Sequence, residues 1–459
     1  MNQAAVVPLL AAWVTQSGQP GQPGQPGQSG RPGGPTGAEG AQPELAAIDP
    51  AGVQVDEVEV LVPGRPGLLD VIATVGGRPV HVVLGLHRPG DEVHLLRAHD
   101  QPVLGLLEDD HGLALVVDAL RDAELASLLL AAVTGRPPDP GPVVPVADTP
   151  EGTSLAFGDR LTFSVFCWLG PSPHPAVELL MALDEAGFNH LAAPIARWRR
   201  GGRDLGVVQE LPPGSASAWA VALASLRDLY ARRGRPEDAG GDFGPEARAL
   251  GTMTARMHLA MDRAFGRRME PVADWVDRIE AALGTDLRAA DPASDPSDGS
   301  AGGPDPAGPG AAAVLQGLRE ADLRGAVIQA HGDFHLGRIA RTDHGWVLAD
   351  CRPGGVPPGG RSPVMRSPLA DVADLLWSLH RAAVVATADR DPADRAAVLP
   401  LADAWEDRNR RAFMAGYLAT PGIGGLLPTN RDHVLALVAA FELARETGRG
   451  ALAGRGALA

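Results

Sequence analysis

The chain has 459 residues, 45% of them hydrophobic, which is enough for two or three domains with a sizeable core. Its net charge of −16 argues against nucleic acid or a membrane surface as the main partner, because both require a positive surface. Two cysteines in so long a chain are typical of a reducing compartment, and we find neither a long apolar run nor a basic leader before an apolar stretch. We therefore expect a cytoplasmic protein without a disulfide framework.

The first part of the chain predicts an N-terminal segment followed by a small β-rich domain. Residues 1–50 contain an apolar stretch and then a repeated Gly-Gln-Pro tripeptide, which is typical of a disordered, flexible insert. Residues 51–135 alternate apolar and polar residues in several short runs, as antiparallel strands do, and end in a helical pattern. The Pro-rich residues 135–152 indicate a linker and hence a domain boundary.

After this boundary the pattern predicts a small lobe of strands and one helix, and then a mostly helical lobe. Residues 150–214 form the first of these, and residues 215–459 the second. The helical lobe contains a second insert at 284–313, rich in Gly, Pro and Asp and typical of disorder. It also contains a predicted β-hairpin that turns at residues 343–345. The expected fold class is α+β.

The most informative stretch is HGDFH, residues 331–335, which places His331, Asp333 and His335 close together. On a strand these three side chains would share a face and could hold a divalent ion, as in a metal-dependent hydrolase. They could also cap a turn and satisfy backbone groups. In a third interpretation, Asp333 is the acid of a kinase-type catalytic loop, and Asp350, at the end of the following hairpin, is the acid that holds Mg²⁺. Loop, hairpin and second acid together are the most specific of these signals.

The chain resembles the actinobacterial maltokinases, relatives of the aminoglycoside phosphotransferases. The resemblance lies in GTSLAFGD (152–159), in VFCWLGPSPHPAVELLMALDEAGF (165–188), in the HGDFH stretch and in RSPLADVADLLWSLHRAA. It covers most of residues 150–385 and, more weakly, the β-rich domain before them. It implies a protein-kinase-like bilobal fold preceded by a β-rich cap. It also implies an ATP- and Mg²⁺-dependent phosphotransferase with an alcohol-group acceptor, which converts maltose to maltose 1-phosphate for glycogen synthesis. Maltokinases often work beside trehalose synthase, so the resemblance adds that enzyme as a partner.

The resemblance also assigns roles to individual residues. Asp333 matches the catalytic base and Asp350 the metal ligand. The main chain of the hinge between the lobes would read adenine. The remaining matches are nucleotide contacts at Ser154 and at the hinge residues Gln209, Glu210 and Leu211, an acid at Asp371, and Glu178, which either keeps the place of the Lys-pairing acid or is an ordinary solvated helix acid. We expect His331 and His335 to support the loop by hydrogen bonds, and Asp371 to cap the helix that starts there.

Several positions depart from the family pattern in ways that affect phosphate and metal binding. Ser164 stands where the family has a strand Lys, and Arg338 stands where it has a Gln or Asn that binds the metal. Arg carries only donors and a permanent charge, so it cannot be a metal ligand. Cys351 and Arg352 replace family acids after Asp350. We expect Arg338 to form an ion pair with Asp350.

Two outcomes stay open for such a site. The chain is either a sugar kinase with impaired catalysis, in which Arg338 and Arg352 contact phosphate, or a pseudokinase that binds a sugar, a nucleotide or a protein partner. The metal-dependent hydrolase is a remote third possibility, which requires a tightly bound metal ion and no ATP.

Overall fold

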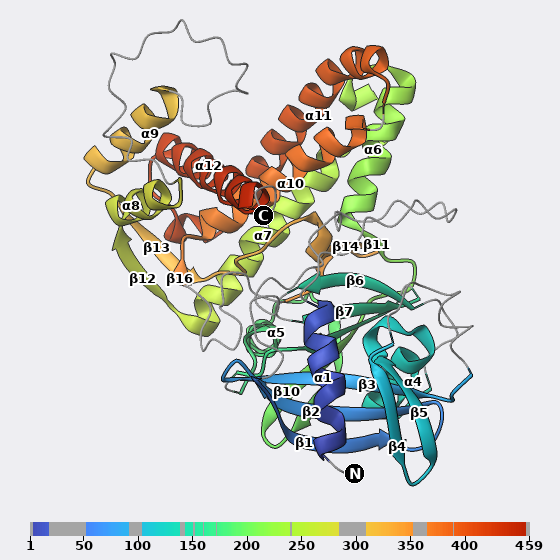
Figure 1. Ribbon diagram of the computed structural model, residues 1–459. Coiled ribbons are helices and arrows are strands. Elements are labelled where there is room, and N and C mark those ends of the chain that lie inside the picture. The colour runs from blue at the N-terminus through green and yellow to red at the C-terminus, as the bar shows by residue number, and fades with distance from the viewer. Residues whose placement is uncertain are drawn as a thin grey trace, which may run out of the picture.

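The computed structural model describes most of the chain outside the two predicted inserts, and Figure 1 shows its helices and strands. The described ranges are 3–17, 52–90, 103–137, 143–149, 152–158, 160–170, 172–238, 241–283, 309–351, 365–388 and 390–455. The Gly-Gln-Pro repeat and most of the predicted insert at 284–313 lie outside these ranges, although the last residues of that insert belong to helix α9. Within the described ranges no helix is long and apolar enough to cross a membrane.

A five-stranded antiparallel sheet with one helix on each face forms the N-terminal part of the structure. Its strand order is β1-β2-β3-β5-β4, and the alternation seen in the sequence is the cause of its two-sided burial. Leu69 and Val71 of β2 face helix α1, whereas Leu68 and Ile72 face helix α4. The elements are α1 (Gln3–Ser17), β1 (Val53–Val62), β2 (Gly67–Val75), β3 (Arg78–His87), β4 (Gly105–Asp109), β5 (Gly112–Asp118) and α4 (Ala123–Thr134).

A second five-stranded sheet, of order β6-β7-β8-β10-β9, follows in the chain. Its first strand lies inside residues 135–152, so the prediction of a linker there is wrong for residues 143–149. Pro145 misled the interpretation, because proline is tolerated on an edge strand such as β6. The elements are β6 (Val143–Thr149), β7 (Gly152–Phe157), β8 (Leu161–Phe166), α5 (Pro175–Glu185), β9 (Ala193–Arg200) and β10 (Arg203–Glu210).

The two sheets share one hydrophobic core. Leu68 and Val83 of the first sheet belong to the same buried cluster as Phe163 and Val208 of the second, with α4 packed among them. Main-chain bonds join the sheets as well, since the backbone N–H of His81 donates to the Cys167 carbonyl (2.7 Å). The first sheet is therefore fixed to the second by packing and by hydrogen bonds.

Three charged or titratable side chains lie at this junction. Asp70 of β2 is fully buried, and its two oxygens contact the imidazole of His81 (2.9 Å) and the guanidinium of Arg200 (2.8 Å). His81 comes from β3 and Arg200 from β9, so the cluster spans both sheets. Because a buried carboxylate without a partner is costly, this contact favours the observed docking over alternatives.

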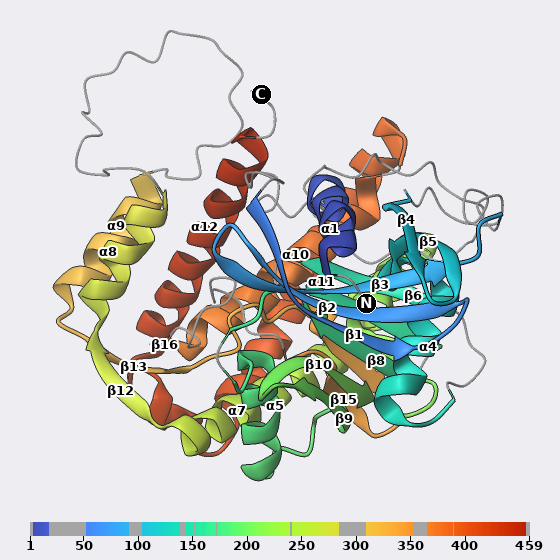
Figure 2. The ribbon, with the colours of Figure 1, turned by 60° about the horizontal axis from the view of Figure 1, so that its bottom comes forward.

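Helices form the other half of the molecule, together with two small three-stranded sheets of order β11-β14-β15 and β12-β13-β16. In Figure 2 the helices α8, α9 and α12 lie side by side at one edge. The predicted hairpin is confirmed: β14 and β15 pair antiparallel around a turn that ends at Gly345, whose φ is +118°. The elements are β11 (Ala216–Ser217), α6 (Ala218–Arg232), α7 (Gly244–Phe265), β12 (Arg267–Pro271), α8 (Val272–Leu283), α9 (Pro309–Glu320), β13 (Arg324–Gln329), β14 (Ile339–Thr342), β15 (Gly345–Leu348), β16 (Met365–Arg366), α10 (Pro368–Ala388), α11 (Pro392–Leu418) and α12 (Arg431–Arg455).

Two glycines let the long helices α7 and α11 approach closely. A Cβ atom on Gly251 of α7 would lie 2.0 Å from the Phe413 carbonyl oxygen, and one on Gly416 of α11 would lie 2.0 Å from the Arg248 carbonyl oxygen. Neither backbone oxygen can move without shifting its helix. The crossing therefore requires glycine at both positions, and it holds α7 in place for the contacts described below.

We predict that Gly251→Ala destabilises the protein by about 2–3 kcal/mol, because the added methyl group forces α7 and α11 apart. Urea unfolding followed by circular dichroism measures this change. The matched control is Gly317→Ala in α9, where a Cβ atom meets nothing within 4 Å; it should stabilise by up to about 1 kcal/mol through helix propensity alone. Equal stability of Gly251→Ala and the parent protein would contradict the close crossing.

Candidate functional site

The HGDFH stretch forms an irregular loop between β13 and a short 3-10 turn at Leu336–Arg338. Gly332 has a φ of +85°, which glycine adopts easily and which breaks the alternation of a strand. The metal interpretation required His331, Asp333 and His335 on one strand face, and that expectation is wrong. Within the described residues no group of three or more His, Cys, Asp or Glu side chains is arranged to hold a metal ion.

The buried carboxylate of Asp371 holds this loop. Its two oxygens accept the backbone N–H groups of His331 and Gly332, both at 2.8 Å. We expected Asp371 to cap its own helix, and that expectation is wrong. It lies in the first turn of α10, where it is fully buried, and its carboxylate binds the loop instead of its own helix.

A histidine and a tyrosine complete the surroundings of Asp371. The Nε2 atom of His258, on α7, lies 3.3 Å from Asp371, and its Nδ1 atom lies 2.9 Å from the hydroxyl of Tyr417 on α11. Burial alone would raise the pKa of Asp371, but the hydrogen bond and charge of His258 outweigh it and lower the pKa to about 2. Asp371 is therefore ionised at neutral pH.

His331 ties the loop to the end of the hairpin. Its Nε2 atom lies 3.0 Å from the Asp350 carbonyl oxygen, and its Nδ1 atom accepts the backbone N–H of Asp333 at 3.4 Å. These partners fit a neutral imidazole that carries its proton on Nε2. Burial lowers the pKa of His331 and keeps it neutral. His331 thus supports the loop through two contacts, one with the main chain of Asp333 and one with the main chain of Asp350.

His335 supports the loop in a more local way. Its Nδ1 atom accepts the backbone N–H of Gly337 at 3.1 Å and so caps the 3-10 turn. Its Nε2 atom lies 3.5 Å from the Asp333 carboxylate. The structure therefore places both predicted support residues next to Asp333.

Arg338 lies between the two predicted acids. Its guanidinium contacts the Asp333 carboxylate at 2.6 Å and forms a second, very short contact with the Asp350 carboxylate. The predicted ion pair between Arg338 and Asp350 is confirmed. Burial works to raise the pKa of Asp333, but the charges of Arg338 and His335 outweigh it and hold that pKa well below its usual range. Asp333 is therefore a weak base.

The residues of this site do not fit a Mg²⁺ ion as they are arranged. A Mg²⁺ ion needs several oxygen ligands, whereas the space between Asp333 and Asp350 is bridged by a guanidinium, which has only donors. Cys351 is buried, and burial raises the pKa of its thiol, so it offers no charged ligand. Arg352 lies outside the described residues.

The predicted phosphate-binding strand carries no cation at the family Lys position. Ser164 is buried in β8, and its hydroxyl lies 2.8 Å from the hydroxyl of Ser154 in β7. The two predicted residues thus satisfy each other across neighbouring strands. Glu178, the predicted partner of the missing Lys, is half-buried in the first turn of α5, and within the described residues it forms no ion pair.

The predicted hinge is engaged in contacts of its own. The Leu211 backbone N–H donates to the Arg160 carbonyl at 2.6 Å, so that group is not available to a bound base. The side chain of Glu210 pairs with Arg160 at 2.5 Å. Gln209 is buried, and its side-chain amide donates to the Ala192 carbonyl at 3.3 Å. The roles of these three residues in nucleotide binding stay predictions.

Sequence reasoning missed three charged residues beside Asp333. Asp374 of α10 is buried, one turn after Asp371, and this spacing was the one available signal. Arg366 contacts Asp374 at 3.3 Å and donates to the Gly332 carbonyl at 3.1 Å. Arg445 of α12 contacts Asp333 at 3.3 Å and forms a very short ion pair with Asp374. No local pattern in the sequence points to Arg445.

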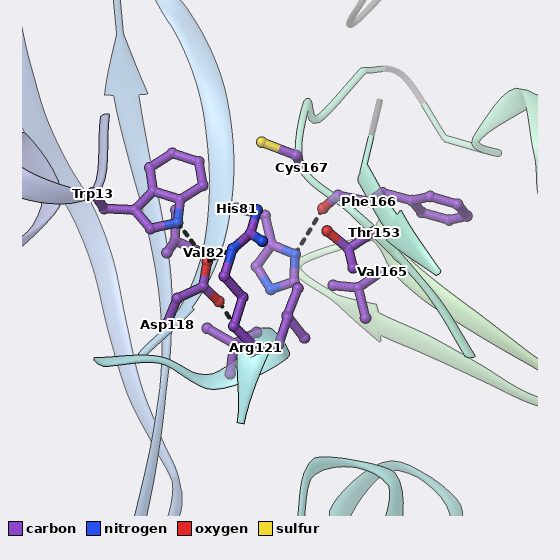
Figure 3. A pocket seen from close by; sticks show the side chains of 11 residues that line it. Trp13, His81, Val82, Asp118, Arg121, Thr153, Val165, Phe166 and Cys167 are labelled. Atoms are coloured by element: carbon purple, nitrogen blue, oxygen red, sulfur yellow. Dashed lines mark hydrogen bonds and ion pairs between the residues drawn. The ribbon is translucent and has the colours of Figure 1, made fainter. Parts of the chain in front are cut away.

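A small pocket lies away from this site, between the two large sheets (Figure 3). Its lining includes Trp13 of α1, His81 of β3 and Cys167 after β8. Its free volume of about 20 Å³ has room for roughly one water molecule. None of the predicted site residues lines it. With a volume of about 20 Å³, the pocket is too small for a sugar or a nucleotide.

Comparisons with known proteins find glucosamine kinases among the relatives of this chain. No protein-family model matches the chain. A glucosamine kinase of Streptacidiphilus jiangxiensis is 29% identical over 399 residues, 82% of this chain and 86% of that protein. A glucosamine kinase of Mycolicibacterium smegmatis is 27% identical over 258 residues, 53% of this chain and 59% of that protein.

Solved structures give the same answer for the fold. A glucosamine kinase in complex with glucosamine, ADP and inorganic phosphate has a TM-score of 0.51 and 22% identity, and covers 86% of this chain and 88% of that one. Another crystal form of a glucosamine kinase has a TM-score of 0.55 and 21% identity, and covers 88% and 89%. The chain is similar to glucosamine kinases. Its fold, a mixture of helices and sheets, is kinase-like, and the two relatives named above are glucosamine kinases, which supports a sugar kinase but not a maltokinase in particular.

We predict that Asp371→Asn destabilises the protein by about 2–4 kcal/mol at pH 7, because two buried N–H groups lose a charged acceptor. The folded-state pKa of Asp371, about 2, lies below its ordinary value of 3.8. Its contribution is therefore fully present above about pH 4 and is lost as the pH falls toward about 2. Urea unfolding of both proteins at pH 7 and pH 3 should show a smaller difference at pH 3.

The control for this prediction is Asp277→Asn on α8. Asp277 also pairs with an arginine, Arg319 at 2.6 Å, but its side chain is 64% exposed. Its replacement should change the free energy of unfolding by less than about 1 kcal/mol. A change for Asp371→Asn that is no larger than this one would show that Asp371 does not hold the loop.

Proposed function

We propose that this chain is an ATP-dependent sugar kinase that phosphorylates glucosamine or a closely related sugar, with transfer slowed by Arg338. The observation that carries the proposal is the meeting of Asp333 and Asp350 on one guanidinium. Asp333 comes from the loop after β13 and Asp350 from the end of the β14–β15 hairpin, as in a kinase-type site. Similarity to glucosamine kinases over 82% of the chain favours glucosamine over the maltose that the sequence resemblance implied.

The proposed reaction is the transfer of one phosphoryl group from ATP to a sugar hydroxyl, and it requires little acid–base chemistry of the protein. A sugar hydroxyl attacks the γ-phosphorus of ATP, the bond from that phosphorus to the β–γ bridging oxygen breaks, and ADP leaves. The hydroxyl proton passes to Asp333. In a loose phosphoryl-transfer transition state this proton leaves late, so the acid serves mainly to orient the hydroxyl. A weak base such as Asp333 is sufficient for that role.

A second candidate is a non-catalytic protein that binds a sugar or a nucleotide. One observation favours it: the Arg338 guanidinium contacts both acids where a Mg²⁺ ion would lie, and it cannot act as a metal ligand. In this case Asp333 would position a bound sugar by accepting its hydroxyl hydrogen bonds, and no phosphate would be transferred. The two candidates share the ligand and differ in the product.

We predict slow, ATP-dependent formation of a sugar phosphate from glucosamine. The purified chain is incubated with ATP and Mg²⁺ and with glucosamine, N-acetylglucosamine, glucose or maltose, and products are identified by mass spectrometry. Asp333→Asn should lower the rate by about 10²-fold or more, because the hydroxyl loses its acceptor. Preferred phosphorylation of maltose would contradict the choice of sugar. No product with any sugar would contradict the kinase and leave the non-catalytic candidate.

We further predict that Arg338→Gln raises the Mg²⁺-dependent rate at least about tenfold. Glutamine removes the cation from between Asp333 and Asp350 and offers a neutral oxygen in its place. The matched control is Arg341→Gln on the same hairpin, which removes an ion pair with Glu246 at 3.0 Å and leaves both acids untouched. A gain of activity cannot come from misfolding. A large loss for Arg338→Gln alone would instead make Arg338 the cation that transfer requires.

A further inference from the structure

Arg445 reaches the candidate site from the C-terminal helix. Figures 1 and 2 show α12 running beside α10, and Arg445 is largely buried there, with 13% of its side chain exposed. Its guanidinium bridges Asp333 at 3.3 Å and Asp374, with which it forms a very short ion pair. It also lies over the ring of Trp377, 5.3 Å from the centroid. One cation thus sits among two acids and an indole.

This position coincides with the approach to the predicted base. Asp333 is paired on both oxygens: Arg338 holds Oδ2 at 2.6 Å, and Arg445 holds Oδ1 at 3.3 Å. A sugar hydroxyl must come within about 3 Å of one of these oxygens to be oriented. The longer contact, to Arg445, is the weaker of the two. The acceptor therefore approaches Asp333 on the side that Arg445 covers.

The contacts of Arg445 with the two acids are incomplete, so a ligand could take the place of its guanidinium. Its Nε atom is buried and has no hydrogen-bond partner among the residues that the structure describes, so the guanidinium is only partly satisfied there. Burial raises the pKa of Asp374 to about 6 in spite of the charges of Arg445 and Arg366, so the compensation of this acid is also incomplete. A ligand that brought its own cation and additional hydrogen-bond donors would satisfy the acids better.

The groups around Arg445 match the chemistry of an amino sugar. An ammonium group is a compact cation with three donors and suits two neighbouring carboxylates. A flat aromatic ring next to them offers a face to a cation or to the C–H groups of a sugar ring. A neutral sugar has no cation to replace the guanidinium, and would leave Asp333 and Asp374 less well paired.

We propose that Arg445 is an internal occupant of the acceptor subsite, that a protonated amino sugar displaces it from Asp333 and Asp374, and that Asp374 selects amino sugars over neutral ones. The proposal rests on the proposed function only for placing the acceptor beside Asp333. It makes Arg445 and Asp374 specificity-determining residues. Neither takes part in the bond changes of phosphoryl transfer.

Calorimetric titration of the full chain with glucosamine, glucose and N-acetylglucosamine, without ATP, tests the proposal. Arg445→Gln should bind glucosamine at least about tenfold more tightly, because the ammonium no longer competes with an internal cation, and should show a clearly smaller gain for glucose, which no longer has to displace Arg445 but brings no cation for the freed acids. Arg445→Lys, which keeps the charge but loses the planar fork that spans two acids, should show a smaller gain. Asp374→Asn should remove most of the preference for glucosamine over glucose.

The matched control is Arg410→Gln, which removes another ion pair of α12. Arg410, on α11, contacts Glu442 at 2.6 Å and touches neither Asp333 nor Asp374. Its replacement loosens the same helix without freeing the subsite, so glucosamine affinity should stay as in the parent chain. Thermal melting confirms that each variant is folded.

Three results would overturn the proposal: weaker glucosamine binding in Arg445→Gln, equal gains in Arg445→Gln and Arg410→Gln, or equal affinities of the parent chain for glucosamine and glucose. Because the titrations contain no ATP, they are independent of phosphoryl transfer. A chain that binds glucosamine as expected but forms no sugar phosphate contradicts the proposed function alone. A chain that phosphorylates glucosamine but is indifferent to Arg445→Gln contradicts this proposal alone.

Discussion

The two hydrogen bonds from consecutive loop N–H groups to Asp371 fix the geometry of the whole candidate site. They force the chain to turn at Gly332, whose positive φ lets both N–H groups point at one carboxylate. Asp333 then follows directly, and His331 is left in position to reach the end of the hairpin. Loop, hairpin and helix α10 are thereby held together around one buried negative charge.

The two ion pairs of Arg338, unlike the hydrogen bonds of Asp371, say little about the stability of the site. A buried ion pair is weak evidence for stability, because the desolvation of its members offsets much of their attraction. One guanidinium shared by Asp333 and Asp350 still leaves the pair of acids with net negative charge, and Arg445 adds a second cation to Asp333. The site is thus built around acids whose compensating charges come from the protein itself. Such an arrangement is suited to exchanging one cation for another.

Much of this was accessible from the sequence, and the reasons are local. Alternation predicted the strands of the first sheet, the strand pattern after the linker predicted β7, β8 and β10 of the second, and a short turn ending at Gly345 predicted the hairpin. The spacing of Asp333 and Asp350 around that hairpin predicted that they meet, and the chemistry of arginine then predicted the contact of Arg338 with Asp350.

What could not be predicted depends on contacts between distant segments. A local rule assigned Asp371 to its own helix end, although its partners are the loop and His258. Arg445 contacts Asp333 only because α12 packs beside α10. The residues near Arg445 in the sequence do not predict this packing. Proline in β6 concealed a strand because its position at a sheet edge is a property of the fold.

The shared core of the two large sheets limits how the molecule can move. Kinase-type enzymes commonly close one lobe over the other around a bound nucleotide. Here β3 is hydrogen-bonded to the segment that follows β8, and α4 is packed between the sheets. The N-terminal sheet must therefore move with the second sheet if the second sheet rotates relative to the helices. Any such motion would therefore carry both sheets and α1 together as one rigid body.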